Sequence, residues 1–472
     1  MAMGRRDREA QGELWIAAAE LPRGGSHPFY DRVNEILDRE GFDRFVEDRC
    51  RKYYAKQLGR PSLAPAVYFR SLMIGYFEGI DSERGIAWRM ADSLALRKFL
   101  GYALTDSTPD HSTISRNRRL IDVETHSDVF KWVLAVLAKH KLLSGKTVGV
   151  DATTLEANAA LRSIIRRDTG ESYQEFLTRL AQESGIETPT REDLAQLDKN
   201  RKSKGSNDDW QHPHDPDAKI AKMKDGRTHL AHKAEHAIDL DTGAVVAVTL
   251  QPADRGDTTS IGETIEQVDE NLAAVMQNEE ACEPLSEQVL KEVVADKGYH
   301  SNAVLKDQKE RKIRTYISEP DRGRRNWKGA TQEETKEKSA ARDAVYGNRR
   351  RIKGDRGKSL MRKRGERVER SFAHNYDTGG MRRTHLREHE NILKRLLIHV
   401  AGFNLSLILR RLLGFGTARS MQDVAARVLR ALAGYIADGM SGLMRVLNDE
   451  GDVRRQVEAN VAPIRQLARW AA

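Results

Sequence analysis

The chain has 472 residues, a formal net charge of +9 and a sequence pI near 9.3. This length allows two or three domains with real cores, and the positive excess favours an anionic partner, of which nucleic acid is the default. The two cysteines, Cys50 and Cys282, exclude a disulfide framework and a cysteine-based metal site, and they fit a reducing cytoplasm.

Neither the N-terminal stretch nor the longest apolar stretch of the sequence predicts a membrane association. The N-terminal stretch MAMGRRDREAQ has no apolar core after its basic residues, so we expect no signal peptide. The longest apolar stretch, 396–409, is too short for a span and is flanked by Arg395 and Arg410. We therefore expect a buried helix there and no membrane partner.

Residues 1–125 are predicted to form an N-terminal helical DNA-binding domain. Apolar residues recur at helical spacing from about residue 31 to residue 120. Ser62 predicts the start of a helix that Gly79 ends, and Ser82 predicts the start of the next. Short helices with tight turns are typical of a helix-turn-helix-like module, but an ordinary helical domain has the same pattern.

The segment TPDHSTISRNRRL is the most suggestive part of this region. Ser112 or Thr113 is expected to cap a helix that presents Arg116, Arg118 and Arg119 to a phosphate backbone. The alternative is a solvated charged face without a partner.

Residues 140–412 are predicted to form an α/β domain. A helix from about 125 to 140 leads into a β-branched strand that we expect to end at Asp151. After it, 159–224 is predicted as a polar inserted segment with helices at 172–184 and 191–197 and no core of its own.

The insertion contains a conspicuous polar cluster. Metal binding there is possible in principle, but a turn-rich loop is the favoured interpretation. The cluster consists of His212, His214, Asp215 and Asp217, beside Trp210.

Two strands joined at Asp241-Thr242-Gly243 are predicted as a hairpin. His229, His232 and His236 in the first of them suggest zinc, but strand geometry places His229 and His232 on opposite faces. A helix starting at Gly256-Asp257, the strand VLKEVVADKGY, a helix over 302–311 and the strand IRTYIS follow. This order predicts a mixed sheet with helices on its faces, and 413–472 is predicted as a C-terminal helical tail.

Three isolated acids stand in comparable settings: Asp151 after one strand, Asp296 after another, and Glu369 before an apolar helix. A buried carboxylate is costly unless a cation answers it, and three such groups together suit hard divalent cations. Two Mg²⁺ ions, for which Mn²⁺ can substitute, would hold the attacking and leaving oxygens of a phosphoryl displacement. The window 349–370 carries eleven cations and three acids, a balance of +8 that favours bound DNA.

Four segments resemble the DDE transposases of bacterial insertion sequences, in the group typified by insertion sequences four and five. They are PDHSTISRNRR, VGVDATTLEAN, VVADKGYHS and RVERSFAH with its long apolar helix, and the match spans roughly 50 to 412. DKGY after a strand is fairly specific, and its order with the other segments is very specific.

The resemblance implies a ribonuclease-H-like catalytic fold with Asp151, Asp296 and Glu369 as the metal-binding triad. It also implies binding of double-stranded DNA, namely the terminal inverted repeats and a target, by a homodimer or higher multimer. Cleavage and strand transfer are then the expected reactions. Two other interpretations stay open: a catalytically silent repressor derived from such an enzyme, and a ribonuclease-H-like nuclease.

One departure from the family pattern affects the third acid. In the family a Tyr and an Arg usually precede the Glu, and a Lys or Arg follows about two helical turns later. Here Gly365 stands four residues before Glu369, with Arg364 and Arg367 beside it, Tyr346 lies far upstream, and Asn375 stands six residues after. Arg382 or Arg383 is left for the basic role, and Glu366 competes with Glu369 for the triad. Phosphate contacts near the site are predicted for a further set of cations. They are Lys297, Arg364, Arg367, Arg370, Arg382 and Arg383.

Overall fold

The computed structural model describes residues 27–55, 62–201, 205–223, 226–278, 290–321, 323, 325, 327 and 331–421. Cys282, the N-terminal stretch and the tail after residue 421 lie outside the described residues, and so do the predictions made for them.

The N-terminal region is helical, as predicted, and its helices begin and end for local reasons. Gly79 ends α3 with a φ of +67°, and the Ser82 hydroxyl accepts from Gly85 at the start of α4. Ser62 is not the cap of α3, because Pro65 begins that helix and its fixed φ suits the first turn. The helices are α1 (Pro28–Arg39), α2 (Phe42–Cys50), η1 (Arg51–Tyr53), α3 (Pro65–Glu78), α4 (Glu83–Asp92), α5 (Leu94–Phe99), α6 (His111–Leu120) and α7 (Val123–Lys139).

The arginine-bearing helix α6 is capped by a different residue from the two expected. The Asp110 carboxylate accepts from the Thr113 amide at 2.7 Å, so the helix begins two residues before Thr113. An aspartate at this position also interacts favourably with the helix dipole.

The central sheet has six strands and the mixed topology predicted for an α/β domain. The order is β4-β5-β1-β7-β8. On the edge of β5 away from β1, β4 pairs with the first residues of the strand and β6 pairs with the rest. Strands β1, β7 and β8 are parallel, and β5 is antiparallel to β1, β4 and β6. The strands are β1 (Thr147–Glu156), β4 (Lys219–Lys222), β5 (Thr228–Asp239), β6 (Val245–Pro252), β7 (Glu292–Ala295) and β8 (Arg314–Ile317).

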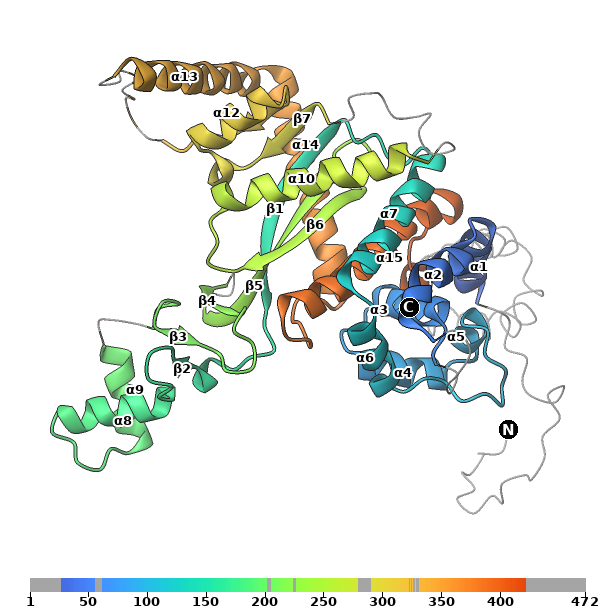
Figure 1. Ribbon diagram of the computed structural model, residues 1–472, viewed down its shortest axis with the longest axis horizontal. Helices are drawn as coiled ribbons and strands as arrows, with labels where there is room; N and C mark the ends of the chain where they lie inside the picture. Colours follow the sequence, from blue (N-terminus) through green and yellow to red (C-terminus); the bar gives the residue numbers. More distant parts are fainter. Residues whose placement is uncertain are drawn as a thin grey trace, which may run out of the picture.

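Helices cover both faces of this sheet (Figure 1). Consecutive residues of β5 show which helix covers which face: Glu235 bonds Ser260 of α10, whereas His236 bonds Ser371 of α14. The hairpin turn and the helix start at Gly256-Asp257 are confirmed. The remaining elements are α10 (Asp257–Met276), η3 (Lys297–Tyr299), α12 (Asn302–Glu310), α13 (Gln332–Lys353), α14 (Asp355–Phe372), the π-helix η4 (Ala373–Thr378) and α15 (His389–Leu413).

One hydrophobic core runs continuously from the N-terminal helices into the sheet. α15 lies at its centre and packs on α3, α7 and β6. Arg395 of α15 is buried and donates to the carbonyls of Leu72 and Ile80, and it fills the space beside Gly75, where any side chain would collide with it. The helical and α/β parts are therefore packed as one body, and the domain boundaries given above stay a prediction.

The predicted buried helix at 396–409 is confirmed as part of α15. A segment at His389–Met421 is long and apolar enough to cross a membrane, but 89% of its most apolar window is buried inside the protein. Burial against α3, α7 and the sheet accounts for its composition.

The inserted segment projects from the sheet beyond β2 and β3 (Figure 1). Its helices are confirmed, but the expectation that it lacks any core is wrong. Trp210 is buried against Tyr173 and Phe176, with ring centroids 5.2 Å apart in both pairs, and a second small cluster joins α8 to α9. The elements here are η2 (Leu161–Ser163), β2 (Ile165–Arg166), α8 (Tyr173–Glu183), α9 (Arg191–Asn200) and β3 (Trp210–Gln211).

Candidate active site

Asp151 lies inside β1 and not at its end. The strand continues to Glu156 because each of its residues from Val148 onward has a partner in β5, and Asp151 itself pairs with His236. Val148 and Val150 enter the main core, so the alternation of the strand turns Asp151 towards α14. Its side chain is 29% exposed, which leaves it open to a ligand from that face.

Arg364 of α14 forms an ion pair with Asp151. Its Nη1 lies 2.7 Å from Asp151 Oδ2, and its side chain is only 14% exposed. Burial raises the pKa of Asp151 above its usual range, although Arg364 and the Ala152 amide act against this. The negative charge of Asp296 also raises that pKa, so the two carboxylates are within electrostatic reach of each other.

Asp296 follows the last residue of β7, as predicted. β7 is parallel to β1 and adjacent to it, and Val294 faces the α14 side with Leu360. By alternation Asp296 faces the same side as Asp151. Its Oδ1 accepts from the Gly298 amide at 2.8 Å, which starts the single turn η3.

Glu369 does not begin its helix. α14 starts at Asp355, so Glu369 lies near the C-terminal end and is exposed, as is Ala373, while Phe372 is buried. One flank of α14 meets the β5–β6 turn, where Lys363 Nζ is 3.3 Å from Asp241 Oδ1 and Arg367 approaches Gly243. At 100° per residue, Glu369 lies on the other, open flank.

Its competitor Glu366 has a partner on the surface. Glu366 Oε1 accepts from Arg370 at 3.1 Å, and both side chains are about half exposed. Among the described residues no group of three or more His, Cys, Asp or Glu side chains is close enough to hold a metal ion. The structure thus brings Asp151 and Asp296 together and leaves the choice of third acid a prediction.

The two aspartates fit hard cations such as Mg²⁺, because they offer partly exposed carboxylate oxygens from neighbouring rigid strands. Arg364 already donates to one oxygen of Asp151. A cation bound to that oxygen would take over the role of Arg364 as countercharge.

The predicted phosphate-binding residues fall into two groups. Arg116 and Arg119 are exposed on α6, and Lys297 is exposed beside Asp296. Arg118, in contrast, is buried and donates to Glu83 at 2.7 Å, so it is not accessible to a phosphate in this conformation. The same holds for Arg364, whose guanidinium is bound to Asp151.

Arg382 lies close to the carboxylates. Its Nη1 donates to Thr153 Oγ1 at 2.9 Å, and Thr153 shares the β1 face of Asp151. Arg383 is more exposed and lies 3.6 Å from Glu156. Arg382 is therefore the better placed of the two for the basic role that the family pattern expects after the Glu.

His232 and His236 of the histidine-rich strand are both buried in the central sheet. His236 is buried between Ser371 and Tyr376, at 3.0 and 2.6 Å, and burial lowers its pKa to about 3. Its bond to Ser371 ties the end of α14, two residues after Glu369, to β5. In the insertion cluster, Asp215 is buried 3.4 Å from His232.

Residues that sequence reasoning did not single out lie under the Asp296 turn. Tyr299, at the end of DKGY, donates to the buried Glu235 at 2.8 Å, and Lys233 lies next to both Glu235 and Asp257. Lys233 and Glu235, inside the strand run HLAHKAEHAID, were the available signal, because charge in a buried strand needs partners.

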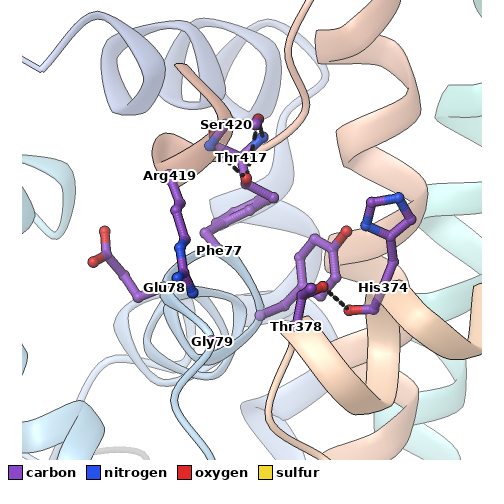
Figure 2. A pocket seen from close by; sticks show the side chains of 9 residues that line it. Phe77, Glu78, Gly79, His374, Thr378, Thr417, Arg419 and Ser420 are labelled. Carbon is purple, nitrogen blue, oxygen red and sulfur yellow. Dashed lines mark hydrogen bonds between the residues drawn. The ribbon is translucent and has the colours of Figure 1, made fainter. Parts of the chain in front are cut away.

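A pocket elsewhere in the protein takes no part in this arrangement. Figure 2 shows it between α3, the π-helix η4 and the segment at Thr417–Ser420, with Phe77, Glu78, His374 and Thr378 in its lining. None of the predicted site residues lines it.

A mixed α/β sheet that carries two carboxylates on neighbouring parallel strands, in a basic protein, is typical of metal-dependent enzymes that act on nucleic acids. Residues 19–120 match a family model described as a transposase domain, and residues 207–405 match one described as a transposase DDE domain. The chain belongs to the DDE transposases, and its fold is ribonuclease-H-like. No curated protein and no solved structure gives a significant match.

Proposed function

We propose that this transposase binds the terminal inverted repeats of its own insertion sequence, cuts at the element ends and joins them to target DNA. The observation that carries the proposal is the placement of Asp151 and Asp296 on one face of adjacent parallel strands. Membership in the group of insertion sequences four and five is part of the proposal.

Asp151, Asp296 and Glu369 are proposed as the residues that would hold the metal ions, and Asp151 is held rigidly because its strand is paired on both sides. Bound Mg²⁺ or Mn²⁺ would activate the attacking hydroxyl and neutralise charge on the phosphate in the transition state. Glu369 would approach from the open flank of α14, whose end is fixed to β5 by the bond between Ser371 and His236.

DNA is proposed to contact two surfaces. Arg116 and Arg119 of α6 would hold the element end, while residues around the carboxylates would hold the scissile strand. The second set is Lys297, Arg367, Arg370, Arg382 and Arg383. Arg118 and Arg364 are left out because their side chains, only 7% and 14% exposed, are enclosed by the protein where they bond Glu83 and Asp151. Assembly on DNA as a homodimer or higher multimer, in the cytoplasm, completes the proposal.

The test uses a linear duplex that carries the DNA flanking the protein's own gene, a target plasmid and Mg²⁺. A transposase cuts at the inverted repeats and yields products in which the 3′ ends are joined to the plasmid. A nuclease gives cuts without joined products, and a repressor binds without cutting. Either of the last two outcomes contradicts the proposal.

DNA affinity is expected to fall steeply with salt, because every neutralised phosphate adds about 0.9 to the slope of log affinity against log salt. The double variant Arg116→Ala with Arg119→Ala should reduce that slope by about 2. The measurement is fluorescence anisotropy at a series of salt concentrations.

A matched control is Arg179→Ala in α8, whose guanidinium already bonds Glu171 and Glu183. Its slope should equal that of the wild type. An unchanged slope in the α6 double variant would remove α6 from the interface.

A further inference from the structure

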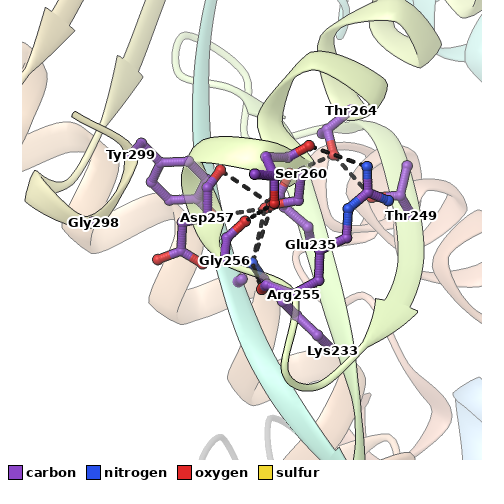
Figure 3. Close-up of polar contacts among 12 residues, drawn as sticks. Lys233, Glu235, Thr249, Arg255, Gly256, Asp257, Ser260, Thr264, Gly298 and Tyr299 are labelled. Atoms are coloured by element: carbon purple, nitrogen blue, oxygen red, sulfur yellow. Dashed lines mark hydrogen bonds and ion pairs between the residues drawn. The ribbon is translucent and has the colours of Figure 1, made fainter. Parts of the chain in front are cut away.

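A buried polar network lies on the face of the sheet opposite α14, beneath the turn that carries Asp296 (Figure 3). Lys233 and Glu235 of β5 are its centre, with exposed fractions of 5% and 0%. Charged side chains at such positions are costly unless each polar atom finds a partner. The identity of those partners therefore indicates what the network holds in place.

Glu235 uses both of its oxygens. Oε1 accepts from Tyr299 at 2.8 Å and from Ser260 at 2.9 Å, and Oε2 accepts from Thr264. Two of these donors belong to α10, and the third belongs to the turn after Asp296. Glu235 thus joins the Asp296 turn to α10.

Lys233 supplies the compensating charge. Its Nζ lies 2.5 Å from Asp257 Oδ1, 3.1 Å from Ser260 Oγ and 3.8 Å from Glu235 Oε1. Asp257 in turn limits the other side of the turn, because a Cβ at Gly298 would lie 2.5 Å from Asp257 Oδ2. The turn is therefore confined at Gly298 by α10 and at Tyr299 by β5.

Only two residues, Lys297 and Gly298, separate Asp296 from Tyr299, and the single turn η3 connects them. Asp296 accepts from Gly298 at one end of this turn, and Tyr299, 1% exposed, is bonded at the other. The path from the anchored Tyr299 to Asp296 is therefore short, and both of its ends are held by hydrogen bonds.

We propose that Tyr299 is a positioning residue for Asp296 and acts through its hydrogen bond to Glu235. This inference rests on the proposed function, in which Asp296 binds a metal ion. Without the hydroxyl, Glu235 loses a donor inside the fold and the turn loses its anchor, so Asp296 is less well placed to share an ion with Asp151. Partners behind a metal ligand typically contribute about 10- to 100-fold in metal affinity.

The probe is Mn²⁺ alone, added to the full chain without DNA and followed by titration calorimetry. Tyr299→Phe is expected to weaken Mn²⁺ binding about tenfold or more. The matched control is Tyr316→Phe: Tyr316 is buried in the neighbouring strand β8 and donates to Glu292 at 3.1 Å, at the opposite end of β7. The control should bind Mn²⁺ as the wild type does.

A second variant protects the test against a folding defect. Glu235→Leu removes the acceptor itself and should weaken binding by a similar factor, and the double variant should be no weaker than the single ones, because both substitutions break the same bond. Thermal unfolding of each variant shows whether it is folded at the temperature of the titration.

The remaining outcomes overturn the inference in distinguishable ways. Equal weakening in Tyr299→Phe and Tyr316→Phe would mean general loosening of the sheet. Wild-type binding in Tyr299→Phe, together with loss of binding in Asp296→Asn, would remove the positioning role and leave the metal site intact. Wild-type binding in Asp296→Asn would remove Asp296 from the metal site, and the proposed function would lose its basis as well.

Discussion

Asp151→Asn is expected to reduce cleavage of element ends by about a thousandfold or more while DNA binding stays near the wild-type level. The substitution replaces a charged oxygen ligand by a neutral amide of the same shape. Metal ions contribute several kcal/mol to phosphoryl transfer, and each 1.36 kcal/mol corresponds to a factor of ten in rate. The measurement is end cleavage in Mg²⁺ beside binding of the same duplex.

The same substitution has a cost in stability that the assay must separate from the chemistry. Arg364 loses the carboxylate 2.7 Å away, and a hydrogen bond between charged groups contributes about 1.5–3 kcal/mol. Burial disfavours the charge of Asp151, however, so its removal offsets part of this loss; thermal unfolding of the variant is measured, and cleavage is assayed well below that temperature.

Asp241→Asn is the matched control for Asp151→Asn. It removes the same charge from a residue that also pairs with a cation of α14, Lys363, but on the exposed β5–β6 turn. Its cleavage rate should equal that of the wild type. Cutting of element ends by a folded Asp151→Asn protein would show that the metal assignment is wrong.

Glu369→Gln is expected to eliminate cleavage, whereas Glu366→Gln should retain most of it. Both residues are exposed on α14, so burial does not separate them. Arg364 marks the direction of Asp151, and Glu366 lies about 160° around the helix from it by the shorter way, on the flank that meets the β5–β6 turn. Glu369 lies about 140° from it, on the flank that the β5–β6 turn leaves open.

The interactions of Glu366 and Glu369 also predict a larger effect for the substitution at Glu369. Glu366 forms a surface ion pair with Arg370, and such pairs contribute about 0–1 kcal/mol. Loss of a metal ligand costs several kcal/mol in the transition state. The two variants should be compared at one Mg²⁺ concentration, and an active Glu369 variant beside an inactive Glu366 variant would reverse the assignment.

Arg364 gives the site a feature that the family pattern did not suggest. In the protein without metal or DNA it neutralises Asp151, and this relieves the repulsion between Asp151 and Asp296. Cations of α14 near the carboxylates therefore form ion pairs with acidic residues of the protein itself, as Arg364 does with Asp151. Only the cations that remain exposed are available to phosphates.

The sequence alone was sufficient wherever the deciding interaction is local. Gly79 ends α3 through its own positive φ, Ser82 caps α4 through an amide three residues away, and the turn around Gly243 joins adjacent strands. Asp296 was placed correctly after β7, because the apolar run that precedes it can only be a buried strand. The α/β class followed from the order of such elements.

Contacts between distant segments decided the rest. β1 runs past Asp151 because β5, some eighty residues later, supplies hydrogen bonds up to Glu156. Arg118 and Arg364 appear in basic runs like their neighbours, yet Glu83 and Asp151 draw them into the protein. Which cation of a basic run is buried, and which acid faces the metal site, depends on the orientation of a helix against a sheet. That orientation is fixed by the packing of the whole core. It cannot be read from any single stretch of the sequence, because each stretch contributes only a few of the contacts.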